Sequence, residues 1–129
     1  MQRVLVRSVL LLVCSAMMSG CVLALGAAGG AGGVVYYKGN LKEYLSYPVT
    51  EIYVATVQAM ADEGMKVYSD EHDPYKAQLK FEDIDERSVW IDIEAVTREA
   101  SEIKIRVGVS GDKNRASQLL EKVKAKLLL

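Results

Sequence analysis

Side chains that can act as nucleophiles, acid–base groups or metal ligands are few in this chain of 129 residues, which has one His and two Cys. That inventory argues against a metal site built from His and Cys ligands. His72 stands between two carboxylates at residues 71–74, a turn that ends in proline, and we expect it to be exposed. We expect a solvated charge cluster at a second turn, formed by Asp83, Asp85 and Glu86. We therefore predict no catalytic residues, no metal and no cofactor.

Cys21 is the residue whose chemistry the sequence specifies best. Two arginines within the first seven residues precede an apolar run at residues 8–18, the pattern of a secretory signal. The run ends in Met-Ser-Gly-Cys, which resembles the lipobox of bacterial lipoproteins with Met in the usual place of Leu. The resemblance implies cleavage between Gly20 and Cys21 by signal peptidase II and acylation of the cysteine. Several acyl chains would then hold the protein at a membrane.

The chain is expected to have three parts. Residues 1–20 are the lipoprotein signal peptide, residues 21–33 are the lipidated cysteine with a Gly/Ala-rich tether, and residues 34–129 are a single domain. We favour a flexible tether because glycine opposes a helix in water, although the glycine spacing also fits close helix packing in a bilayer. An uncleaved membrane-spanning helix is the alternative to the lipid anchor.

The domain is predicted to begin with a short β-hairpin followed by a helix. Residues 34–38 and 41–47 are β-prone and are joined by Gly39-Asn40, a pair that suits a tight turn. Thr50 is the predicted N-cap of the helix and Gly64 the residue that ends it. The apolar face of this helix is formed by Ile52, Ala55, Thr56, Ala59 and Met60.

Four runs with period-2 alternation follow the helix, which is typical of antiparallel strands covered on one side. They lie at residues 65–69, 75–82, 89–95 and 103–109. Asp112 is a suitable N-cap for a final amphipathic helix. The predicted fold class is α+β. We expect a four-stranded antiparallel meander with one helix before and one after it packed on the same face, preceded by a short β-hairpin.

Trp90 breaks the apolar alternation of its strand, because it falls in phase with Asp92 and Glu94. It should therefore face away from the helices. Together with Lys80 and Arg106 on other strands, it is a candidate partner contact, since Trp and Arg are frequent binding hot spots. The alternative is that Trp90 packs on the aliphatic stems of Lys and Arg, or lies under the hairpin.

Motifs along most of the chain carry a family resemblance. They are the lipobox, the Ala/Gly tract, Tyr-x-Gly-x-Leu at residues 37–41 leading to Tyr47-Pro48, the helix that ends at Gly64, and the closing LLEKVKAKL helix. This arrangement resembles small bacterial lipoproteins of the family catalogued as domain of unknown function 3568. The resemblance implies a lipid-anchored envelope protein of uncharacterised role and supplies no catalytic residues.

The expected function is that of a non-catalytic, lipid-anchored envelope protein of unknown specific role, either structural or binding an envelope protein partner. A formal net charge of -1, with acids and bases interspersed, opposes nucleic-acid binding, and no small-molecule substrate is indicated. The resemblance to outer-membrane lipoproteins implies that, in a diderm cell, Val22 after the lipidated cysteine permits export to the outer membrane, because it is a residue other than Asp. The domain would then face the periplasm. The alternative is a small-ligand or cell-wall-binding module that uses the outer sheet face around Trp90.

Overall fold

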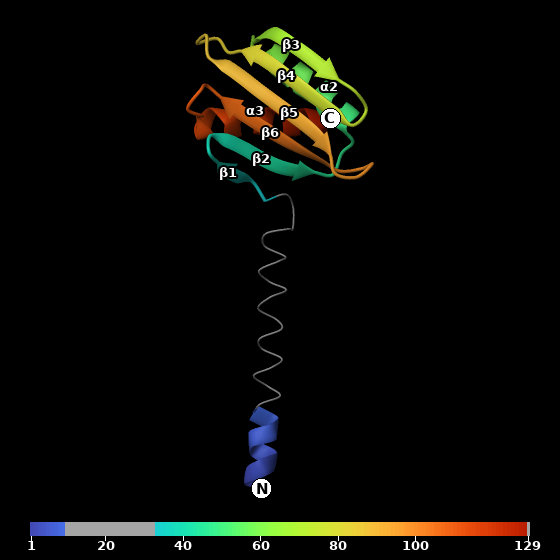
Figure 1. The fold of residues 1–129 in the computed structure, drawn as a ribbon, viewed down its shortest axis with the longest axis vertical. Coiled ribbons are helices and arrows are strands. Elements are labelled where there is room, and N and C mark those ends of the chain that lie inside the picture. The colour runs from blue at the N-terminus through green and yellow to red at the C-terminus, as the bar shows by residue number, and fades with distance from the viewer. Residues whose placement is uncertain (10–32, 129) are drawn as a thin grey trace. The chain divides into compact units, whose positions relative to one another are not determined.

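The computed structural model describes residues 1–9 and 33–128 (Figure 1). It divides into two compact units, Met1–Gly33 and Val34–Leu129. The second unit is α+β, as predicted. Its elements are β1 (Val35–Tyr37), β2 (Asn40–Leu45), α2 (Val49–Asp62), β3 (Lys66–His72), β4 (Lys76–Glu82), β5 (Ser88–Ala95), β6 (Ser101–Val107) and α3 (Lys113–Leu127).

All six strands form one antiparallel sheet, in the order β1-β2-β6-β5-β4-β3. Strands β3 to β6 are the predicted meander. The hairpin β1–β2 is not separate from it, because β2 pairs with β6 and places Leu41 opposite Ile105. Helices α2 and α3 pack together on one face (Figure 1). Neither helix of this unit, as far as residues 34–128 are described, covers the opposite face, which we call the outer face.

The turn between β1 and β2 lies one residue earlier than the sequence suggested. Its central residues are Lys38 and Gly39, with φ of 49° and 82°. Two successive positive φ values are the pattern of a type I′ turn, whose twist matches that of the strands it joins. Asn40 therefore leaves the turn and pairs with Tyr37 as the first residue of β2.

Helix α2 begins earlier than predicted and ends where predicted. Pro48 is its N-cap, and Thr50 lies inside the first turn instead of capping it. Pro48 takes this place because its carbonyl already accepts the first amide hydrogen bonds of the helix. At the other end Gly64 has φ of 74°, and the Met65 amide donates to the Met60 carbonyl, as in a Schellman motif.

Strand β3 was predicted to bury one face, and this is wrong. All seven of its residues are exposed, and its register with β4 shifts between Val67 and Ser69, at a bulge. The strand lies at the sheet edge, where α2 contacts β4 and β5 more extensively than it contacts β3. Bulges and charged side chains are common on such edges, because they discourage pairing with another chain.

The hydrophobic core lies between the sheet and the two helices. The alternation predicted for the other three meander strands is confirmed for most of their inward residues, which are buried: Ala77, Leu79, Phe81, Val89, Ile91, Ile93, Ile103, Ile105 and Val107. It is wrong at the strand ends, where Tyr75, Ala95 and Val109 are exposed. Asp112 caps α3 by accepting the Arg115 amide, as predicted. All buried apolar residues of the described chain lie between Leu41 and Val123. The unit Val34–Leu129 therefore has a complete core and can fold without the preceding residues.

The first unit is described only in part. Residues 2–9 are helical. Most of the predicted apolar run, the cleavage residues Gly20 and Cys21, and the tether lie outside the described residues. Across residues 1–9 and 33–128, no helix is long and apolar enough to cross a membrane.

Candidate functional site

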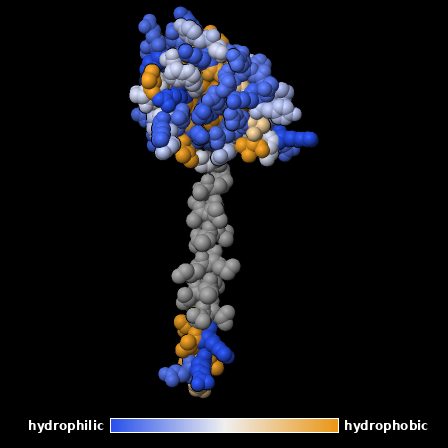
Figure 2. All heavy atoms as spheres, in the orientation of Figure 1, coloured by the Kyte–Doolittle hydropathy of each residue, from blue (hydrophilic) through white to orange (hydrophobic). Residues whose placement is uncertain are grey.

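The outer face carries Trp90, which points away from both helices as its phase predicts. Its neighbours Val89 and Ile91 are fully buried, whereas Trp90 is half-buried. The strand register places Lys80 opposite Trp90 on one side and Arg106 on the other. The three predicted contact residues therefore form one row across β4, β5 and β6. Most of this face is hydrophilic (Figure 2).

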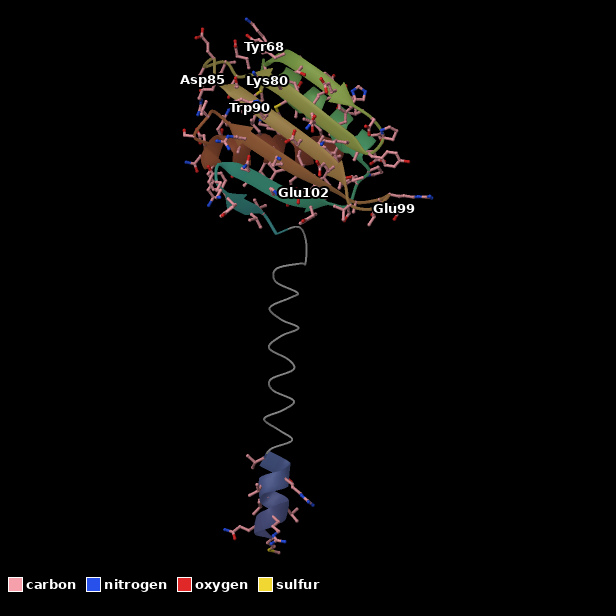
Figure 3. All side chains as sticks on the ribbon, viewed as in Figure 1. Tyr68, Lys80, Asp85, Trp90, Glu99 and Glu102 are labelled. Atoms are coloured by element: carbon pink, nitrogen blue, oxygen red, sulfur yellow. The ribbon has the colours of Figure 1, made fainter. Side chains whose placement is uncertain are left out.

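Lys80 lies between two aromatic rings. Its Nζ is 5.7 Å from the centroid of the Trp90 ring and 5.8 Å from that of Tyr68 (Figure 3). The Tyr68 hydroxyl donates to Glu82 Oε2 at 2.8 Å, and this hydrogen bond raises the pKa of Tyr68. Sequence reasoning placed Tyr68 on the polar side of its strand but missed it as a site residue, because the bulge in β3 sets its approach to Lys80. Tyr68, Lys80, Trp90 and Arg106 are hereafter the outer row.

Arg106 is held by backbone carbonyl groups. Its Nη1 donates to the Lys38 carbonyl at 3.2 Å, and its Nη2 donates to the Val109 carbonyl. The guanidinium thus ties the β1–β2 turn to the end of β6. The hairpin lies beside the meander, not over Trp90, so that the expectation of Trp90 beneath the hairpin is wrong. Packing of Trp90 against a lysine side chain agrees with the geometry at Lys80.

The charges around the outer row are mostly paired. Lysines on three strands form ion pairs on the outer face: Lys42 with Glu102 at 3.6 Å, Lys76 with Glu94 at 3.3 Å, and Lys104 with Asp92 at 3.0 Å. In the described part of the chain neither Lys80 nor Arg106 pairs with a carboxylate. The outer row therefore concentrates two uncompensated cations beside two aromatic rings.

A shallow hollow of about 290 Å³ lies next to Trp90. Its polar lining comes from the edge strand β3, from β4 and from β5, the strand of Trp90 itself: Ser69, Glu71, Gln78, Lys80 and Asp92. An aromatic wall with amide, hydroxyl and carboxylate groups around it can bind a small polar ligand by stacking and hydrogen bonding.

The prediction of a solvated carboxylate cluster is wrong for Asp83, which is only 4% exposed. Arg115 donates to both carboxylate oxygens, Nε to Oδ2 at 2.7 Å and Nη2 to Oδ1 at 2.9 Å. The Ile84 amide also donates to Oδ1. The hydrogen bonds from Arg115 are the largest cause of the lowered pKa of Asp83. Asp85 and Glu86 are exposed, as expected.

A second arginine extends this network. Arg87 donates to Asp85 at 2.6 Å and to the capping residue Asp112 at 2.8 Å. The pKa of Asp112 is lowered, mainly because it accepts the Arg115 amide. Arg115 also donates to Glu63 at 3.1 Å, near the end of α2. The network joins the β4–β5 turn to both helices, which gives these carboxylates a structural role.

His72 is exposed, as expected, but it belongs to β3 and not to the following turn. Because residues two apart on a strand share a face, His72 meets Asp70, with Nδ1 2.9 Å from Oδ1. Its ring also stacks on Tyr53 with centroids 4.0 Å apart. The Tyr53 hydroxyl donates to Asp70 at 2.7 Å, a bond that raises the pKa of Tyr53 and lowers that of Asp70.

Sequence reasoning missed a buried ion pair between Glu43 and Lys124. Glu43 lies between the inward residues Leu41 and Leu45 of β2 and is buried. Lys124 Nζ donates to its Oε1 at 3.2 Å, while Oε2 has no partner among the described residues. The signal available in the sequence was a Glu at an inward position of an alternating strand.

The described residues include no group of three or more His, Cys, Asp or Glu side chains placed to hold a metal ion. The residues predicted for lipidation and cleavage, Cys21 and Gly20, lie outside the described residues, so that this site remains a prediction from the sequence.

The whole chain can now be compared with known proteins. The family model described as "Protein of unknown function (DUF3568)" matches residues 4–126. The chain belongs to this family. The matched range includes every strand of the DUF3568 domain and nearly all of α3. Among curated proteins the comparison finds no match. The family description names no activity, so that any function must be argued from the residues of this chain.

Proposed function

We propose that this protein is a non-catalytic envelope lipoprotein, anchored by lipid on Cys21, whose domain binds a partner. The observation that carries the proposal is the position of Met-Ser-Gly-Cys directly after a short apolar run. Asp83, one of the carboxylates that could have served acid–base chemistry, is held by Arg115, which supports a structural role for it.

Intact mass spectrometry of the membrane-extracted protein tests the anchor. The expected mass is that of a chain beginning at Cys21 plus its acyl groups. Cys21→Ser should lose the acyl mass and the cleavage, because only the thiol forms the thioether to the lipid. Ser19→Ala is the matched control, since it leaves the cysteine in place. A full-length, unmodified mass for the wild type would reject the proposal and indicate an uncleaved anchor.

The destination within the envelope is a separate part of the proposal. In a diderm cell, Val22 after the acylated cysteine is expected to direct the protein to the outer membrane, with its domain in the periplasm. Membrane fractionation measures in which membrane the acylated protein resides. The substitution Val22→Asp should shift the acylated protein to the inner membrane. Recovery of the acylated wild type in the inner membrane would contradict outer-membrane sorting while leaving the lipid anchor intact.

A second candidate function is a small-ligand or cell-wall-binding module, favoured by the hollow beside Trp90. Because Trp90 is the only Trp, its fluorescence reports on this site directly. Soluble peptidoglycan fragments should quench or blue-shift the emission, and Lys80→Ala should weaken that response. Lys76→Ala, on the same strand and face, is the control. A flat titration across envelope glycans and lipids would count against this function.

A further inference from the structure

The two edges of the sheet carry opposite charge. Residues 34–42, which include β1, its turn and the first three residues of the neighbouring strand β2, contain two lysines and no acid, a formal charge of +2. Residues 66–73, which include β3, contain one lysine and three carboxylates, a formal charge of -2 with His neutral. Five inter-strand spacings of about 4.8 Å separate the edges, roughly 24 Å in all. The domain is therefore polarised along its sheet.

The basic edge also exposes apolar and aromatic side chains. Val34, Val35 and Tyr37 are all exposed, Tyr37 to 65%. Lys38 Nζ lies 5.3 Å from the centroid of the Tyr37 ring. Lys113, at the start of α3, approaches Tyr36 at 5.9 Å and adds a third cation to this end of β1. The edge thus combines amphipathic rings with lysines, the composition of surfaces that sit at a membrane interface.

We propose that the β1 edge, residues 34–42, binds the surface of a bilayer that contains anionic phospholipid. The proposal rests on the lipid anchor proposed above, because residues 21–33 limit the start of β1 to about 45 Å from the acylated cysteine even when fully extended. Anionic headgroups attract Lys38 and compete with Glu102 for Lys42, whose Nζ lies 3.6 Å from that carboxylate, whereas they repel the carboxylates of the β3 edge. The domain then stands with its basic edge on the lipid and its acidic edge away from it.

Charge complementarity selects a lipid surface over a second copy of the chain. A second β1 edge would present lysines and no acid to the lysines of the first, and β1 offers only three residues for such pairing. A lipid surface instead supplies negative charge over the whole edge.

The experiment uses residues 34–129, which contain the complete core, with a hexahistidine tag before Val34. The tag binds a nickel-chelating lipid in phosphatidylcholine vesicles and so replaces the natural anchor. Two single-Trp probes are compared in a Trp90→Phe background, Tyr37→Trp on β1 and Tyr68→Trp on β3. The native tyrosines are matched in exposure, at 65% and 63%. Quenching by brominated acyl chains reports which edge approaches the lipid.

With phosphatidylglycerol in the vesicles, the probe at position 37 should be quenched and the probe at 68 should not. Lys38→Glu/Lys42→Glu should abolish the quenching, while Lys66→Glu/Lys76→Glu, with the same change in net charge, should not. For the untagged domain Lys38 should contribute about fivefold in partitioning, and Lys42 should contribute less because it is paired with Glu102. Raising the ionic strength to 1 M should release the untagged domain from the vesicles, because the Debye length falls to about 3 Å.

Equal quenching of both probes, quenching only at position 68, or quenching at 37 that persists without phosphatidylglycerol would overturn the proposal. A dimer in solution that already shields position 37 would overturn it in favour of a second copy. None of these measurements involves Cys21. A failed vesicle experiment is therefore distinguishable from a failed mass measurement.

Discussion

Arg115→Met should weaken the domain strongly, because it unpairs a buried carboxylate. Methionine keeps part of the apolar stem but removes hydrogen bonds of 2.7 and 2.9 Å to Asp83 and of 3.1 Å to Glu63. Asp83, which is 4% exposed in the wild type, would keep only the Ile84 amide and the nearby charge of Arg87. Removing one partner of a buried ion pair costs about 3–5 kcal/mol. Because Arg115 itself is 18% exposed, we expect the lower end, about 3 kcal/mol.

Urea unfolding of residues 34–129, followed by circular dichroism, measures this loss. For a slope of about 2 kcal/mol per M, the midpoint should fall by about 1.5 M. Lys122→Met is the matched control on the same helix, since Lys122 meets Glu63 at 3.6 Å and is 61% exposed. That variant should stay within about 0.5 kcal/mol of the wild type. Similar midpoints for the two variants would refute the assigned role of Arg115.

The pH dependence gives an independent check. The pKa of Asp83 is lowered in the folded protein, chiefly by Arg115. A lowered pKa contributes stability that is present above the unfolded value, about 3.9, and is lost as the pH falls through the folded value. The difference in unfolding free energy between wild type and Arg115→Met should therefore be largest near neutral pH and should shrink below about pH 4. A constant difference would exclude Asp83 as the cause.

Three further predictions concern packing and buried charge. Gly111→Ala should lower the melting temperature more than Gly108→Ala: both glycines have positive φ, but only at 111 would a Cβ overlap the β1–β2 turn. Equal effects would contradict that close approach. Leu120→Asp places a charge at a position 2% exposed and should unfold the domain by circular dichroism, whereas a loss within about 0.5 kcal/mol would contradict the packing. Lys124→Met removes the ion-pair partner of a buried carboxylate, so that its urea midpoint should fall further than that of Lys126→Met, whose partner is exposed.

Sequence patterns correctly predicted the features that depend only on residues close together in the chain. The inward residues of β4, β5 and β6 follow from period-2 alternation because one side of each strand is buried against the helices. The end of α2 at Gly64 and the cap of α3 at Asp112 follow from backbone and hydrogen-bonding preferences of single residues. These features need no knowledge of distant partners.

The errors came where a distant partner or a strand's place in the sheet decides the outcome. Asp83 looked solvated because its partner lies 32 residues away. Glu43 and Lys124 are 81 residues apart, and no local pattern joins them. Strand β3 has the composition of a half-buried strand, but its place at the edge and its bulge leave it exposed. The outer row was predicted in part. The alternation of apolar residues along β5 placed Trp90 on the outer face, but only the pairing of β5 with β4 and β6 brings Lys80 and Arg106 beside it.

The two proposed binding surfaces are compatible because one is an edge of the sheet and the other is its face. If the β1 edge rests on lipid, the strands lie along the membrane and the sheet rises from it, strand by strand, toward β3. Trp90 on β5 then lies three strand spacings from β1, about 14 Å above the lipid-facing edge. The hollow beside it would open sideways, toward the space next to the membrane. Vesicle binding at β1 should therefore leave the response of Trp90 to a soluble ligand unchanged, and competition between the two would show that they share one surface.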